Sequence, residues 1–145
     1  MLRFAPLFSL FLFASAIAAP IPKAKVKDGE AILGKWKLVE KQKDGVPSGA
    51  IESHVAVLDG KTITVARGRD ESDEVMLYTL DTDKRWIDLS PPIPDAESMK
   101  GRYELDGDTL VIAVGMGKPS ERPKEVKGGS GIAFLKLRRI VEVKK

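Results

Sequence analysis

Cysteine is absent from this 145-residue sequence, and histidine occurs only once, at His54. Without cysteine there are no disulfide bonds and no thiol chemistry, so the fold must depend on its hydrophobic core. Charge of one sign is also lacking, because 24 Lys and Arg residues nearly balance 21 Asp and Glu residues. Proteins that bind nucleic acids or membrane surfaces gather basic groups on one face. We therefore expect neither kind of partner.

Long apolar runs are scarce, and the clearest lies near the N-terminus, at residues 4–13. Arg3 precedes it and small residues follow, which is the three-part layout of a secretory signal peptide. The run is well short of the roughly 20 residues that cross a bilayer, and no later segment is apolar enough to do so. Ala16 and Ala18 favour cleavage after Ala18. We expect residues 1–18 to be removed and the mature chain, without a transmembrane segment, to be periplasmic or extracellular.

The remaining chain has the length of one ordinary domain. Residues 19–28 are rich in Pro and Lys and are predicted to form a flexible leader. The domain is expected to occupy residues 29–145, beginning with a short helical turn from Gly29 to Leu33.

Short apolar stretches separated by turn-forming residues indicate β-structure, and no window has a sustained 3.6-residue apolar period. Asp59-Gly60 and Asp106-Gly107 each lie between two such stretches, which is a strong hairpin signal because Gly and Asp tolerate positive φ. The pattern predicts eight strands: Trp36 to Lys41, Val55 to Leu58, Lys61 to Ala66, Val75 to Leu80, Trp86 to Leu89, Gly101 to Leu105, Thr109 to Val114 and Ile132 to Val143.

Consecutive strands joined by short turns form a meander, and about eight strands can avoid exposed edges by closing into a ring. Along residues 101–114, apolar side chains alternate with polar or mixed ones, so the sheet has an inner face. The predicted fold is therefore all-β: an antiparallel, up-and-down, eight-stranded barrel.

Three segments, in this order and spacing, carry a family resemblance: Gly34-Lys35-Trp36, the run from Gly101 to Leu110, and Arg122-Pro123. The first resembles the Gly-x-Trp signature of lipocalin-like barrels. Together the three resemble a small, uncharacterised lipocalin-like domain of exported planctomycete proteins. The resemblance implies an eight-stranded up-and-down barrel and brings no established activity or ligand.

In lipocalins the Trp of this signature closes one barrel end, and an Arg from the last strand packs over its ring. The resemblance assigns these closing roles to Gly34 and Trp36, with either Arg138 or Arg139 as the stacking residue. This chain is shorter than lipocalins and lacks a clear C-terminal helix after the barrel. Because a small eight-stranded barrel can be filled by its own side chains, both a hollow and a filled interior stay open.

No residue cluster predicts catalysis, a metal site or a cofactor. Glu52, Ser53 and His54 include the residue types of a nucleophile–base pair, but sequence neighbours seldom face one another. His54 is therefore expected in a surface turn. The acidic clusters at 70–74 and 81–83 lack the ligand spacing of a calcium loop and are interpreted as solvated hairpin ends.

The long segment 115–131 carries Lys118 and Arg122 near one barrel mouth. It is either a basic rim that attracts a ligand or a solvated connection tied down by an Arg122 ion pair. The first expectation for Trp86 and Tyr103 is a place in the core or barrel lining, and the second is a role as ligand contacts. The leading hypothesis is a non-enzymatic exported module that binds a small apolar or amphipathic ligand or an envelope component. The alternative is a filled barrel that binds a protein partner in the cell envelope, and a His54-dependent hydrolase ranks third.

Overall fold

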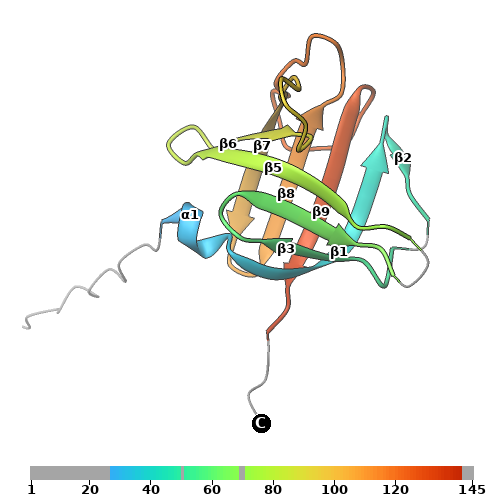
Figure 1. Cartoon of the computed structure of the whole chain (residues 1–145), viewed down its shortest axis with the longest axis vertical. Coiled ribbons are helices and arrows are strands. Elements are labelled where there is room, and N and C mark those ends of the chain that lie inside the picture. The colour runs from blue at the N-terminus through green and yellow to red at the C-terminus, as the bar shows by residue number, and fades with distance from the viewer. Residues whose placement is uncertain (1–26, 50, 69–70, 142–145) are drawn as a thin grey trace, which may run out of the picture.

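The computed structural model in Figure 1 describes residues 27–49, 51–68 and 71–141. The predicted signal peptide, most of the predicted leader and the last four residues lie outside the described residues. The helical turn predicted near Gly29 is present as α1 (Asp28–Ala31). Asp28, predicted to belong to the leader, is the first residue of this helix, so the folded domain begins slightly earlier than expected.

Antiparallel strands make up most of the rest of the described fold. Their bounds are β1 (Gly34–Lys43), β2 (Val46–Pro47), β3 (Val55–Leu58), β4 (Thr62–Ala66), β5 (Glu74–Asp81), β6 (Trp86–Ser90), β7 (Met99–Asp106), β8 (Thr109–Gly115) and β9 (Ile132–Arg139).

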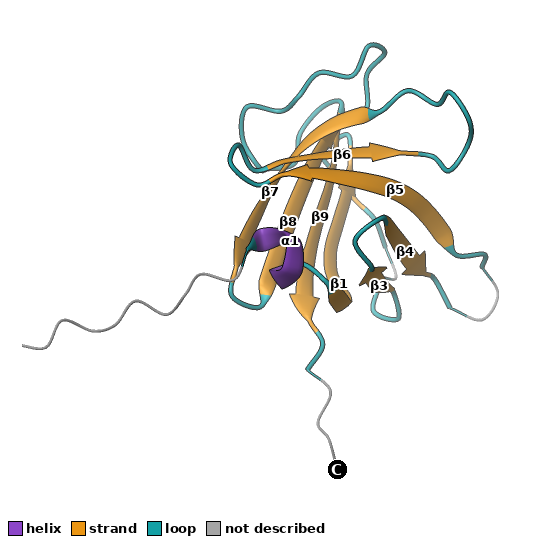
Figure 2. Ribbon diagram, turned by 60° about the vertical axis from the view of Figure 1, so that its left-hand side comes forward, coloured by secondary structure: helices purple, strands orange, loops and turns teal. Residues whose placement is uncertain are grey.

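Each strand from β3 to β8 pairs with the next one along the chain, and β1 pairs with both β3 and β9. Eight strands therefore form a closed antiparallel barrel, which confirms the predicted fold class. Figure 2 shows α1 near one end of this barrel and the β6–β7 and β8–β9 connections at the other. The two ends are accordingly built from different parts of the chain.

The sequence prediction missed β2. Asp44 and Gly45 both have positive φ, at 55° and 76°, and join β1 to β2 through a two-residue turn. This is the same Asp-Gly signal that identified the β3–β4 and β7–β8 hairpins. β2 pairs only with β1 and takes no place in the ring.

The predicted extension of the last strand to Val143 is wrong for the residues that the structure describes. β9 ends at Arg139, and Ile140 and Val141 are not in a strand. Its two partner strands explain this end: Arg139 pairs with Trp36 close to the start of β1, and Arg138 pairs with Thr109, the first residue of β8. Beyond Arg139, β9 would find almost no further strand residues to pair with on either side.

Trp36 fills the end of the barrel next to α1, and none of its surface is exposed. Its indole N–H donates a hydrogen bond to the Ile32 carbonyl at 2.9 Å. The Arg139 guanidinium lies 4.3 Å from the ring centroid and donates hydrogen bonds to the carbonyls of Ala31 and Leu33. Arg139 therefore takes the stacking position, whereas Arg138 is exposed on the outer face.

Gly34 allows this closure. Its φ is 121°, a conformation that side-chain-bearing residues rarely adopt, and a Cβ there would lie 3.6 Å from Nη1 of Arg139. The side chains packed inside the barrel form one cluster: Ile32, Trp36, Leu38, Ala56, Leu58, Ile63, Val65, Tyr78, Ile87, Leu89, Tyr103, Leu110, Ile112, Val114 and Leu137.

Trp36→Ala should lower the free energy of unfolding by about 3–5 kcal/mol, because it removes a large, fully buried side chain and leaves a cavity. Chemical denaturation measures this loss. Val57→Ala, at a residue 37% exposed on the outer face, is the control and should cost no more than about 0.5 kcal/mol. Equal losses in the two variants would contradict the closing role of Trp36.

Candidate binding cavity

A cavity of about 360 Å³ occupies the half of the barrel away from Trp36. This volume falls within the roughly 300–1,000 Å³ of small-molecule sites. Most of its wall is apolar and includes three methionines, whose flexible side chains adapt to ligand shape. The residues around it are Leu38, Lys41, Gln42, Lys43, Ile63, Val65, Arg67, Glu74, Met76, Leu89, Met99, Val114, Met116, Ala133 and Leu135.

Charged side chains form the rim of this cavity. Arg67 donates a hydrogen bond to Glu74 across the β4–β5 connection, and Nζ of Lys41 lies 3.9 Å from the same carboxylate. The hydrogen bond to Glu74, and then its charge, raise the pKa of Arg67 above its ordinary value. Because these side chains remain 31–42% exposed, the rim is in contact with solvent.

A bulge in β1 brings the lysines to this rim. Trp36 and Leu38 face inward, but the register with β9 shifts between Leu38 and Glu40. After the shift, Lys41 pairs with Leu135 and Lys43 with Ala133, and all four residues line the cavity. Strict alternation from Leu38 would have directed Glu40 and Gln42 inward and both lysines outward. The sequence pattern therefore did not predict that Lys41 and Lys43 line the cavity.

His54 is not in a surface turn, as the sequence predicted, but is only 9% exposed. Its backbone carbonyl accepts a hydrogen bond from the amide of Leu38, which places it beside β1 immediately before β3. Alternation with the buried residues Ala56 and Leu58 directs the imidazole inward. That alternation was the signal available in the sequence.

Trp86 lies on the outer face of the barrel, which corrects its predicted place in the core or lining. Ile87 and Leu89 are the buried residues of β6 and face the interior, so Trp86 and Asp88 face outward. Two cations lie against the Trp86 ring, with Nζ of Lys84 4.4 Å and the guanidinium carbon of Arg122 4.0 Å from its centroid. It does not line the cavity.

Arg122 anchors the β8–β9 connection to the outer wall. Its Nη1 donates hydrogen bonds to Asp88 at 2.8 Å and to the Gly101 carbonyl at 2.6 Å. Of the two interpretations of this segment, the structure shows the connection tied down by an Arg122 ion pair.

The same connection covers apolar side chains outside the barrel. Ala113 is completely buried and Phe134 is 8% exposed, yet neither belongs to the interior cluster. Arg102 donates a hydrogen bond to the carbonyl of Pro123, and a Cβ at Gly115 would overlap the Glu121 carbonyl. Beyond Met116, which lines the cavity, the segment therefore packs against the outer wall.

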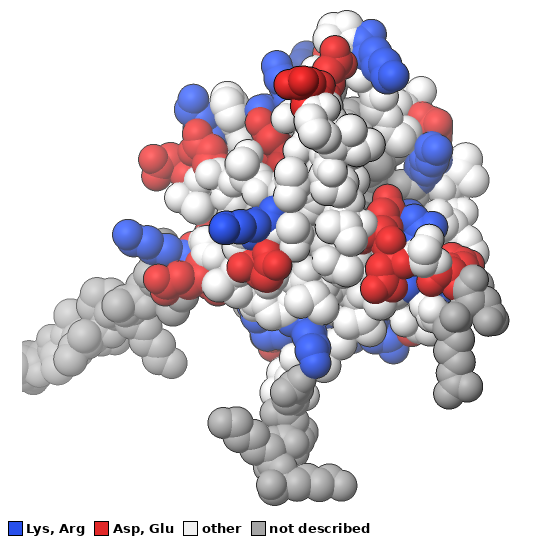
Figure 3. Space-filling model, in the orientation of Figure 1, with Lys and Arg blue, Asp and Glu red and all other residues white. Residues whose placement is uncertain are grey.

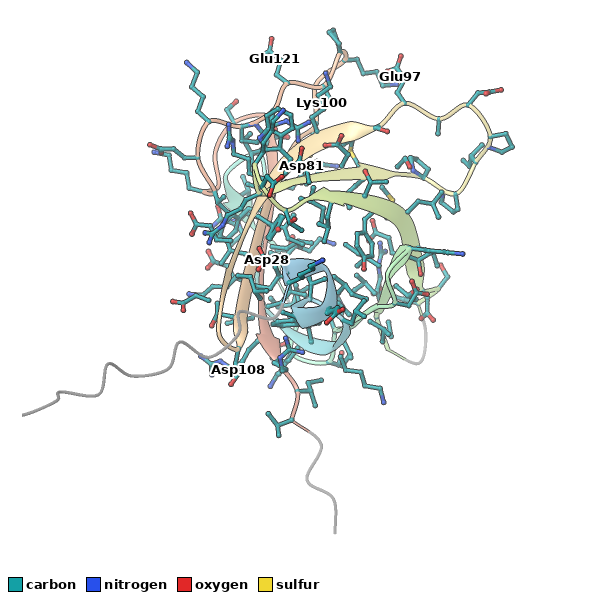
Figure 4. All side chains as sticks on the ribbon, turned by 90° about the vertical axis from the view of Figure 1, so that its left-hand side faces the viewer. Asp28, Asp81, Glu97, Lys100, Asp108 and Glu121 are labelled. Atoms are coloured by element: carbon teal, nitrogen blue, oxygen red, sulfur yellow. The ribbon has the colours of Figure 1, made fainter. Side chains whose placement is uncertain are left out.

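Tyr103 and Lys118 lie away from the cavity lining. Tyr103 is 1% exposed inside the barrel, where its hydroxyl donates to Asp28 at 2.9 Å, and burial is the main cause of its raised pKa. Lys118 is exposed and lines a second hollow that shares Met99 and Met116 with the cavity. Figure 4 shows Glu97, Lys100 and Glu121 at this end, far from Asp28 and Asp108.

Three other kinds of feature were sought among the described residues: a metal site, a membrane-spanning helix and a nucleic-acid interface. The part of the chain that the structure describes contains no group of three or more His, Asp or Glu side chains arranged to hold a metal ion. None of the helices in this part is long and apolar enough to span a membrane. On the face seen in Figure 3, basic and acidic side chains are interspersed, unlike the single-sign patch of a nucleic-acid interface.

No protein-family model, curated protein or solved structure matches this chain. The barrel is shown by the structure, and membership of the planctomycete lipocalin-like family remains a prediction that rests on the Gly34-Lys35-Trp36 and related motifs.

Arg122→Ala should lower the free energy of unfolding by about 1.5–3 kcal/mol, because it removes hydrogen bonds made by a charged group. It should also speed amide hydrogen exchange between residues 116 and 131. Lys124→Ala, at an exposed position in the same connection, is the control and should change neither measurement. If both variants behaved alike, the anchoring role of Arg122 would be wrong.

Proposed function

We propose that this chain is an exported, non-enzymatic module that binds a small apolar or amphipathic molecule inside its barrel. The observation that carries the proposal is the cavity of about 360 Å³ between the β-strands. The export part of the proposal rests on the signal-peptide pattern of residues 1–18.

The cavity suits an apolar ligand because transferring apolar surface out of water is favourable, by about 25 cal/mol for each Å² buried. Ile63, Leu89 and Leu135 offer apolar wall, and the methionines can move to fit it. With about 30 Å³ for a group the size of a water molecule, the cavity holds about twelve such groups. A short alkyl chain or a single small ring system is of this size.

The alternative hypothesis, a filled barrel that binds a protein partner, agrees with only one half of the barrel interior. Trp36, Tyr103 and Leu110 are almost completely buried in one half. The other half is hollow and opens at a charged rim. A barrel with only a protein-binding outer surface has no need of this hollow, so the cavity favours the ligand-binding hypothesis.

Ala133→Phe should fill the cavity with an aromatic ring and weaken the binding of a neutral probe such as octan-1-ol at least tenfold. Isothermal titration calorimetry measures the affinity. Because Ala133 borders empty space, the unfolding free energy should fall by less than the roughly 1–3 kcal/mol typical of overpacked cores.

Ala66→Phe is the matched control, since Ala66 ends β4 between two inward-facing neighbours and projects outward. It should leave octan-1-ol binding unchanged. Absence of binding in the native protein, or equal binding by both variants, would contradict a ligand site within the barrel.

A further inference from the structure

Two buried nitrogen atoms beside the cavity lack hydrogen-bond partners. Among the side chains that the structure describes, Nδ1 of His54 and Nε of Arg67 are the buried polar atoms without one. Buried polar groups in native proteins are nearly always paired, so each such atom requires an explanation. A ligand that accepts a hydrogen bond provides one.

The strand register places both residues on one stretch of inner wall. Val55 of β3 pairs with Ala66 of β4, so the preceding His54 lies opposite the following Arg67. On its other side His54 is joined to Leu38 by a backbone hydrogen bond. Leu38 and Arg67 both line the cavity, and the His54 side chain lies between them, nine-tenths buried.

The charges at this end favour an anion. Among the residues that the structure describes, Lys41, Lys43 and Arg67 line the cavity together with a single carboxylate, Glu74. Nε of Arg67 can only donate, because the guanidinium remains protonated in proteins. Guanidinium groups match carboxylates in geometry and form strong, charge-assisted hydrogen bonds with them.

We propose that the cavity binds an amphipathic carboxylate, with its alkyl chain among the apolar side chains and its head group at Arg67 and His54. This inference rests on the proposed function and narrows its ligand class. Nε of Arg67 donates to one carboxylate oxygen, and His54 donates from Nδ1 in the tautomer that carries its proton there. Lys41 and Lys43 supply further positive charge at the rim.

Glu74 has an opposing effect in this arrangement. Its carboxylate accepts a hydrogen bond from Nη2 of Arg67 and so competes with the ligand for the same guanidinium. Removing the charge of Glu74 should strengthen the binding of an anion. Removing the charge of Arg67 should weaken it, although both changes break the same ion pair.

The test compares octanoate with octan-1-ol, two probes of equal chain length that differ in the head group, by titration calorimetry on the mature protein. The native protein should bind octanoate at least tenfold more tightly, and added NaCl should reduce this preference. Arg67→Gln should weaken octanoate binding about tenfold, and Glu74→Gln should strengthen it a few-fold. Both variants should change the affinity for octan-1-ol by a smaller factor than the affinity for octanoate, because the alcohol carries no charge.

Lys37→Gln, an exposed outer-face position on β1, is the charge-matched control and should change neither affinity. Equal affinities of the native protein for the two probes would overturn the carboxylate proposal while leaving the ligand-binding proposal intact. So would Arg67→Gln and Glu74→Gln variants that shift octanoate binding in the same direction. If neither probe binds, the proposed function fails as well.

Discussion

The rest of this structure depends on the contact between the Trp36 ring and the guanidinium of Arg139. It joins the helical turn, the first strand and the last strand, because the indole N–H bonds to Ile32 and the guanidinium of Arg139 covers the ring. A sheet whose first and last strands pair has no free edge in its ring, and only then do its residues have a defined inside and outside. The large side chain also fills the barrel end in which it lies.

Filling one end determines where a ligand can bind. Large side chains, including Trp36 and Tyr103, occupy the end near α1, whereas Val65, Val114 and Ala133 leave space at the other end. The β8–β9 connection contributes Met116 to the cavity wall and then packs along the outer wall through Arg122. The cavity therefore results from the distribution of side-chain volume along the strands and from the path of a single connection.

Local pattern was enough to predict the helical turn and the ring strands in their order, although β2 was missed. Alternation and the Asp-Gly turns identified all eight ring strands, and the family resemblance gave the Trp36 closure with Arg139 as one of two candidates. These features are encoded by neighbouring residues, which is why they can be recognised without the structure.

The faces of three sets of side chains were missed or predicted wrongly. The β1 bulge after Leu38 reverses which residues face inward, so Lys41 and Lys43 were missed as rim residues. Trp86 was predicted inside because it is large and aromatic, although its strand already has inward-facing neighbours in Ile87 and Leu89. His54 was judged from its adjacent residues rather than from its alternation with β3. Only the bulge depends on contacts across strands, because it is a shift of register between β1 and β9. The places of Trp86 and His54 follow from alternation along their own segments.

The central claim, a barrel filled at the Trp36 end and hollow at the methionine end, is tested most directly by NMR. Methyl-labelled methionine and indole N–H signals are followed while octan-1-ol is added. The account predicts that the methyl signals of Met76, Met99 and Met116 shift together and that the Trp36 indole signal does not. Movement of the Trp36 signal with unchanged methionine signals would contradict it.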